Sequence, residues 1–97
     1  MWVIPNVSGA GQRPAVNIDL ARTLEVARAD SGRDLDRYAV YAVFGPLAVD
    51  TNDWVPLVEV ASDNSDETIG IDRAYAIVDA IVEAVRRGDR VLYMSEI

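Results

Sequence analysis

The feature that most constrains this chain is a run at residues 37–44 whose alternating positions are apolar on both sides. On one side lie Tyr38, Val40, Ala42 and Phe44, and on the other Ala39, Tyr41 and Val43. A strand with two apolar faces must be covered on both, which is typical of a position in the middle of a sheet. We therefore predict that this run forms the central strand.

Other segments rich in apolar residues predict the remaining strands. They are residues 1–4, 16–26, 47–49, 54–60 and 90–94. In the segment from Val16 to Val26 the even positions are apolar except for Arg22, which predicts one bent strand or two strands with a solvated face. Pro56 indicates that the segment 54–60 lies at a sheet edge, because proline cannot donate to a ladder. The segment 90–94 predicts an extended tail that returns to the sheet.

The apolar period changes from two to three-and-four after residue 70. One side of the helical wheel carries Ala74, Ile77, Val78, Ile81, Ala84 and Val85. Asp72 is placed to cap the N-terminus of this helix, and Gly88 stands where a helix commonly ends. Arg86 and Arg87 lie in the last turn, where the helix dipole favours cations. The sequence predicts one helix, from Asp72 to Arg87.

The 97 residues contain no linker and no internal repeat, so residues 1–97 are expected to form a single domain. We predict an α+β fold: an antiparallel meander of four to six strands, packed by one C-terminal helix, with a short apolar extended tail. One helix about 10 Å wide covers roughly two strands spaced about 4.8 Å apart. A half-barrel, the N-terminal loop or a second copy must cover the rest, and we expect self-association.

Four pieces of the chain follow one another in a distinctive order. They are VNIDL at 16–20, RYAVYAVF at 37–44, the predicted helix at 72–87 and GDRVL at 88–92. This order resembles that of small, uncharacterised bacterial and phage proteins in which a β-meander precedes one C-terminal helix. The resemblance implies a fold and carries over no catalytic residue.

The composition excludes several kinds of site. The chain has no cysteine and no histidine, and its nine basic residues are all arginine. It therefore lacks the groups for a disulfide framework, a Cys/His zinc site or a Ser-His nucleophile, and for the lysine of a P-loop or a Schiff base. The remaining side chains suit binding, and we expect no enzymatic activity, no catalytic residue, no cofactor and no metal.

The charge of the chain restricts its partners. Sixteen acidic residues against nine basic ones give a net charge of −7, which opposes the phosphate backbone and disfavours direct nucleic-acid binding. The charge permits a protein partner or an imitation of DNA. No segment approaches the roughly 18 apolar residues of a membrane span, and no secretory signal is recognisable, so we expect no membrane association and a cytoplasmic protein.

One candidate ligand site lies in the loop SGAGQR at residues 8–13. The backbone amides of Gly9 and Gly11 could hold an anion, with Arg13 as a second anchor, and Arg22 and Tyr41 complete the candidate set. A dinucleotide fingerprint requires a preceding strand and a following helix, whereas Pro14 and another strand follow here. A plain connecting loop is the competing interpretation.

A second candidate consists of four acidic residues near the start of the helix. They are Asp63, Asp66, Glu67 and Asp72. Their spacing does not reproduce the EF-hand loop, and a solvated loop leading into a helix explains the same residues.

Three hypotheses about function remain. The first is a small, non-enzymatic and oligomeric interaction module of bacterial or phage type, whose sheet face or edge binds another protein. The alternative is a protein that binds or sequesters a small, nucleotide-like anion between arginines and aromatic side chains. The third is an acidic DNA-mimic inhibitor.

Overall fold

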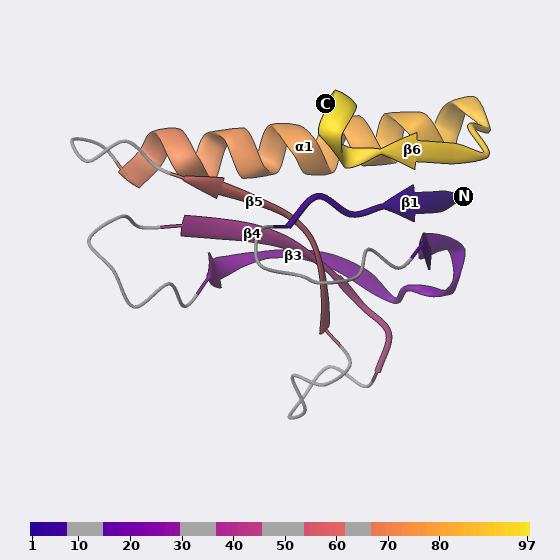
Figure 1. Cartoon of the computed structure of the whole chain (residues 1–97), viewed down its shortest axis with the longest axis horizontal. Helices are drawn as coiled ribbons and strands as arrows, with labels where there is room; N and C mark the ends of the chain where they lie inside the picture. Colours follow the sequence, from indigo (N-terminus) through magenta and orange to yellow (C-terminus); the bar gives the residue numbers. More distant parts are fainter. Residues whose placement is uncertain (8–14, 30–36, 46–53, 62–66) are drawn as a thin grey trace.

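The computed structural model describes residues 1–7, 15–29, 37–45, 54–61 and 67–97, which form two small sheets and one long helix (Figure 1). The elements are β1 (Trp2–Ile4), β2 (Val16–Asn17), the 3-10 turn η1 (Ile18–Leu20), β3 (Thr23–Ala29), β4 (Arg37–Val43), β5 (Trp54–Ala61), α1 (Glu67–Arg87), β6 (Val91–Tyr93) and the 3-10 turn η3 (Met94–Glu96). The α+β class predicted from the sequence is confirmed.

The strands divide between two sheets, where the sequence predicted a single meander. β3, β4 and β5 form an antiparallel meander with β4 in the centre, as predicted. In the second sheet β1 lies between β2 and β6, antiparallel to β2 and parallel to β6. A parallel pair needs a long crossover between its strands, and α1 belongs to that crossover here. The strand predicted at 47–49 lies outside the described residues.

The two sheets meet at Asn6. Its backbone N–H donates to the carbonyl oxygen of Leu57 at 2.8 Å, and Asn6 forms an isolated parallel bridge with Val58. β5 is otherwise the edge of the meander, which confirms the position predicted from Pro56. Pro56 lies opposite Tyr41, next to an irregularity in the β4–β5 register.

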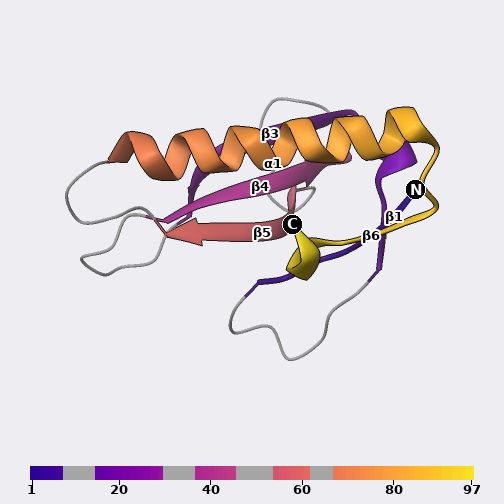
Figure 2. The same cartoon turned by 90° about the horizontal axis from the view of Figure 1, so that it is seen from above.

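The helix lies over the meander, and the second sheet runs along one flank of the helix (Figure 2). Between these three layers lies the core, whose buried side chains are Val3, Val16, Ile18, Val40, Ala42, Leu57, Val58, Ala74, Ile81 and Met94. In the part of the chain that the structure describes, β3 crosses beneath α1 to its opposite flank, and no helix or strand lies beside that flank in the layer of the helix (Figure 2). This flank is the open side of the layer.

The helix begins earlier than the sequence predicted. It starts at Glu67, so Asp72 lies inside the helix, exposed, and the prediction that Asp72 caps it is wrong. The buried stripe also begins earlier, because Gly70 is buried one turn before the fully buried Ala74. Burial of this turn outweighs the low helix propensity of glycine, which had suggested a later start. The residue preceding Glu67 lies outside the described residues.

The segment 16–26 also departs from the predicted period. Val16 and Ile18 are buried and Leu24 and Val26 pack against the core, but Leu20 is 71% exposed. The turn η1 interrupts the strand here, with the Asn17 side chain accepting a hydrogen bond from the N–H of Asp19 at 3.1 Å. The turn rotates Leu20 out of the phase that the strand pattern implied.

The C-terminus of α1 follows the prediction made for Gly88. Gly88 has a φ of +80°. Its N–H donates to the carbonyl oxygen of Val85 at 3.0 Å, and the N–H of Asp89 donates to the carbonyl oxygen of Ala84 at 3.0 Å. These two bonds form a Schellman motif, which requires a left-handed residue at this position. The Arg87 guanidinium binds the Asp89 carboxylate at 2.8 Å just beyond the helix.

We expect Gly88→Ala to lower the free energy of unfolding by about 1 kcal/mol, because a side chain disfavours the left-handed conformation. A Cβ at this position would meet no atom within 4 Å, so the cost is conformational and not steric. Gly88→Asn should cost less, since asparagine tolerates this region better. Urea denaturation of the three proteins measures the difference, and equal stability of Gly88→Ala and the parent would contradict the proposed role.

Candidate functional site

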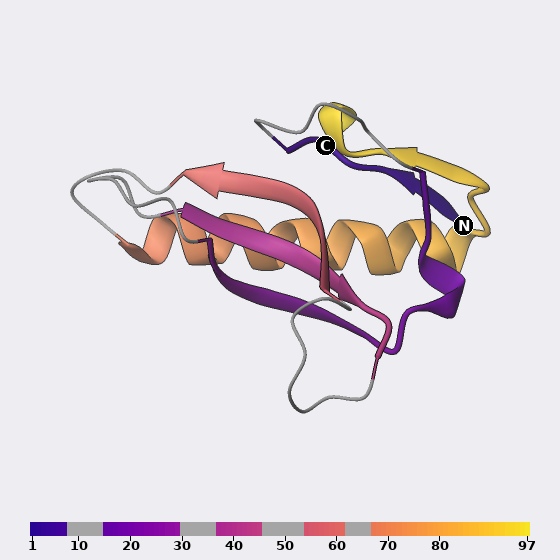
Figure 3. The same ribbon diagram turned by 60° about the horizontal axis from the view of Figure 1, so that its bottom comes forward.

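The face of the meander turned away from α1 is the candidate site, and we call it the outer face. Its side chains follow from the cross-strand register, since opposite residues share a face. They are Thr23, Glu25 and Ala27 of β3, Arg37, Ala39, Tyr41 and Val43 of β4, and Trp54, Pro56 and Glu59 of β5. Figure 3 shows the strands in front of α1, with no described helix or strand in front of them.

Two apolar side chains of the outer face, Ala39 and Val43, are buried within a single copy. Ala39 lies between Ala27 and Glu59, and Val43 lies between Thr23 and Trp54. Ala39 and Val43 are nevertheless 0% exposed. The two-faced apolar pattern of β4 is therefore satisfied in one chain, and a second copy on this face is not needed to bury it.

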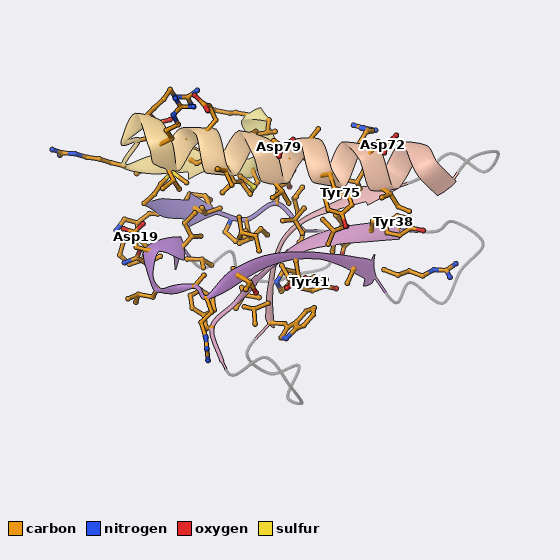
Figure 4. All side chains as sticks on the ribbon, turned by 180° about the vertical axis from the view of Figure 1, so that it is seen from behind. Asp19, Tyr38, Tyr41, Asp72, Tyr75 and Asp79 are labelled. Atoms are coloured by element: carbon orange, nitrogen blue, oxygen red, sulfur yellow. The ribbon has the colours of Figure 1, made fainter. Side chains whose placement is uncertain are left out.

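An aromatic pair lies in the middle of the outer face. The ring centroids of Tyr41 and Trp54 are 5.5 Å apart and their planes are inclined by 59°, a favourable tilted arrangement. Both side chains are half-buried, so each ring keeps part of its surface toward solvent. Figure 4 shows Tyr41 on the side of the sheet away from α1. Two aromatic rings held together in this way form a preorganised contact surface.

Two carboxylates lie near this pair, and one of them is paired with an arginine. Glu59 accepts from Arg37 at 3.4 Å, and Glu25 lies opposite Tyr41 on β3. Burial of the ring and, second, the charge of Glu59 raise the pKa of Tyr41 above its ordinary value of 10.0. The charge of Glu59 disfavours a second negative charge at the Tyr41 hydroxyl, which suits a cation more than an anion.

The structure separates the ligand residues that the sequence suggested. Gly9, Gly11 and Arg13 lie outside the described residues. Arg22 is exposed immediately before β3, and its backbone N–H donates to the carbonyl oxygen of Val43 at 2.7 Å. Two strand pairs separate Arg22 from the Glu25–Tyr41 pair, which puts Arg22 three residues, or about 10 Å, away along the strand.

Sequence reasoning missed Trp54 and Glu59 as neighbours of Tyr41. A strict period of two puts positions 54 and 59 on opposite faces. The register of β5 shifts between its pairings with Val40 and Tyr41, so Leu57 is inserted and the later residues change face. Pro56 is the one signal of such an irregularity that the sequence carries.

The predicted acidic cluster has no described counterpart. Asp63 and Asp66 lie outside the described residues, the side chain of Glu67 is likewise not described, and Asp72 is exposed on α1. Across the described ranges, no group of three or more acidic side chains is arranged to hold a metal ion. No helix in these ranges has the length and apolarity needed to cross a membrane.

No protein family matches the chain, and the searches of curated proteins and of solved structures found no significant similarity. The resemblance to small bacterial and phage proteins stays a prediction from the sequence pattern.

We expect Thr23→Val to raise the free energy of unfolding by about 1 kcal/mol. The Thr23 hydroxyl is buried without a hydrogen-bond partner in the described part of the chain, and valine replaces it with a methyl group of similar size. Thr23→Ser is the matched control, because it keeps the hydroxyl and loses the methyl group, and it should destabilise. Thermal and urea denaturation compare the three, and a less stable Thr23→Val would show that the hydroxyl has a partner.

We expect Tyr41 to ionise at a higher pH than a free tyrosine, because its folded pKa is raised. The neutral ring is the form that the folded state favours, so this contribution to stability is complete below pH 10 and is lost as the pH rises through the folded pKa. Absorbance titration at alkaline pH, comparing the parent with Tyr41→Phe, isolates this group. In Glu59→Gln the midpoint for Tyr41 should fall toward the ordinary value, and an unchanged midpoint would exclude Glu59 as a cause.

Proposed function

We propose that this chain is a non-enzymatic interaction module that self-associates and binds a basic segment of a partner protein on its outer face. The tilted aromatic pair of Tyr41 and Trp54, with the Glu59 carboxylate near Tyr41, is the observation that carries the proposal. Tyrosine and tryptophan are the residue types that most often dominate binding energy at protein interfaces. A cytoplasmic location and a bacterial or phage origin are proposed on the sequence pattern alone.

The chemistry of the pair favours a guanidinium or ammonium group. A cation over an aromatic face gains about 0.5–1 kcal/mol at an exposed site, and the carboxylates of Glu25 and Glu59 add attraction for the same charge. The net charge of −7 steers a basic partner toward the whole molecule. The proposed partner is therefore an arginine- or lysine-bearing segment laid along the outer face.

The same groups weigh against the alternative, a nucleotide-like anion at Tyr41. The carboxylate of Glu59 is close enough to raise the pKa of Tyr41, and it would repel a phosphate there. Arg22, the nearest candidate anchor of the described set, is set apart by the Thr23–Val43 and Leu24–Ala42 pairs.

Titration of the 15N-labelled protein with a peptide of alternating arginine and glycine tests the proposal. We expect the Trp54 indole and the amides of Tyr41 and Glu59 to shift, and a peptide of alternating glutamate and glycine to leave them unchanged. Glu59→Gln should weaken binding about two- to fivefold, the range of one exposed cation contact.

Glu96→Gln is the matched control, because it removes one negative charge from an exposed position outside the meander. Equal weakening by Glu59→Gln and Glu96→Gln would mean that only the overall charge attracts the peptide. Shifts at Tyr41 caused by ADP, with none caused by the basic peptide, would overturn the proposal in favour of anion binding.

A further inference from the structure

A second apolar stripe runs along α1 beside the buried one. The buried stripe consists of Ala74, Ile81 and Ala84, each 0% exposed. One residue further on, Tyr75, Val82 and Val85 are 55%, 54% and 46% exposed, and half-buried Val78 completes their row. The sequence had placed Val78 and Val85 in the core. Val78 packs against the core, whereas Val85 is 46% exposed.

The exposed stripe has the spacing by which two helices pair, and we call these four residues, Tyr75, Val78, Val82 and Val85, the seam. Positions 75, 78, 82 and 85 repeat as a and d positions of a heptad, the pattern by which one helix packs against another. A shift of one residue rotates a side chain by about 100° around a helix of 3.6 residues per turn. The stripe therefore faces sideways, and a helix packed on it would lie next to α1 in the same layer.

That side of α1 is the open flank. The second sheet lies along the other flank (Figure 2), while Figure 4, drawn from the open side, shows Tyr75 at the lower edge of the helix with Asp72 and Asp79 above it. No described segment covers the stripe. Tyr75, Val82 and Val85 thus remain about half exposed in a single copy, while Val78 also packs against the core.

We propose that a second copy of this chain covers the stripe, with the two α1 helices packed side by side and antiparallel. This inference rests on the self-association in the proposed function and names its surface. Antiparallel pairing that uses the whole stripe sets Tyr75 against Val85 of the second copy and Val78 against Val82. By symmetry these contacts make four apolar layers over about 15 Å of helix.

Charge complementarity supports a second copy as the occupant. Asp72, Asp79 and Arg86 share the e position of the heptad, at the exposed rim of the seam. In antiparallel pairing, Asp72 of each copy and Arg86 of the other differ in height along the helix axis by only about 3 Å. The existing partner of Arg86 is Glu83 at 3.8 Å, an exposed pair that contributes little. Arg86 is therefore available to the second copy.

The end of the seam offers a place for the largest side chain. A cleft of about 430 Å³ is lined by Met1, Trp2, Asp19, Val85, Gly88, Asp89 and Arg90. Because Tyr75 pairs with Val85 across the seam, the Tyr75 ring of the second copy reaches the rim of this cleft. Trp2 and the Arg90 guanidinium offer that ring stacking and cation–π contacts. A tyrosine that enters a pocket is a common anchor of protein interfaces.

The seam is too small for a permanent dimer. Stable interfaces bury about 800 Å² per partner, more than we expect from one pair of helices and the two clefts that the Tyr75 rings enter. The two Asp79 carboxylates also approach each other at the twofold axis, which costs binding energy. We therefore expect a reversible dimer whose fraction depends on concentration.

Sedimentation equilibrium over a range of concentrations tests the seam, with the parent moving from 10.6 kDa toward twice that mass. Val82→Glu should raise the dissociation constant at least tenfold, because each Val82 contributes to a central layer. Ala76→Glu is the matched control, with the same added charge on an exposed position of the same helix outside the stripe. Circular dichroism checks that both variants keep the helix. Asp79→Asn should instead strengthen the dimer.

A charge exchange tests the antiparallel orientation. Asp72→Arg and Arg86→Asp should each weaken association about tenfold, because each replaces two attractive contacts with two repulsive ones. The double variant should restore the parent value. One single variant lowers and the other raises the net negative charge, so a general charge effect cannot weaken both.

Three outcomes overturn the seam. If Val82→Glu dimerises as strongly as the parent, the chain self-associates through another surface, and the proposed function stays intact. A failure of the double variant to recover excludes the antiparallel register. A parent that stays at 10.6 kDa at millimolar concentration removes both the seam and the proposed self-association, while peptide binding at Tyr41 is measured independently.

Discussion

The contact between α1 and the inner face of β4 is the interaction on which the rest of the structure depends. Ala74, Ile81 and Ala84 meet a face that includes Val40 and Ala42, all of them 0% exposed. Small side chains on both sides bring the helix close to the sheet, where tight packing maximises dispersion contacts. This contact decides which side of the meander becomes the outer face and which flank of α1 stays open.

The sequence predicted the elements whose pattern is local. The two-faced run at 37–44 identified the central strand, Pro56 identified an edge, and Gly88 marked the helix end, since each depends on a few adjacent residues. Long-range pairing decided the rest. Nothing in residues 91–93 indicates a parallel pairing with β1, and the register shift beside Tyr41 reverses the faces of the later β5 residues.

Long-range pairing also limited how much of the candidate site the sequence could predict. Tyr41 was singled out from the sequence as a ligand residue, but its neighbours Trp54 and Glu59 come from a strand distant in the chain. The sign of the ligand's charge depends on these neighbours. A tyrosine near arginines suggests an anion, whereas a tyrosine between carboxylates indicates a cation. Tertiary structure thus changes the chemistry expected at Tyr41.

The seam on α1 and the outer face are geometrically linked. Two antiparallel helices in one layer are related by a twofold axis perpendicular to that layer, and here the layer lies on the meander (Figure 1). Rotation about this axis keeps both outer faces on the same side of the dimer. A partner with two basic segments on one chain could then engage both copies, and the second contact would form at a high effective concentration. Weak contacts at each Tyr41–Trp54 pair would therefore suffice for firm binding to the dimer, and a reversible seam would let protein concentration control that binding.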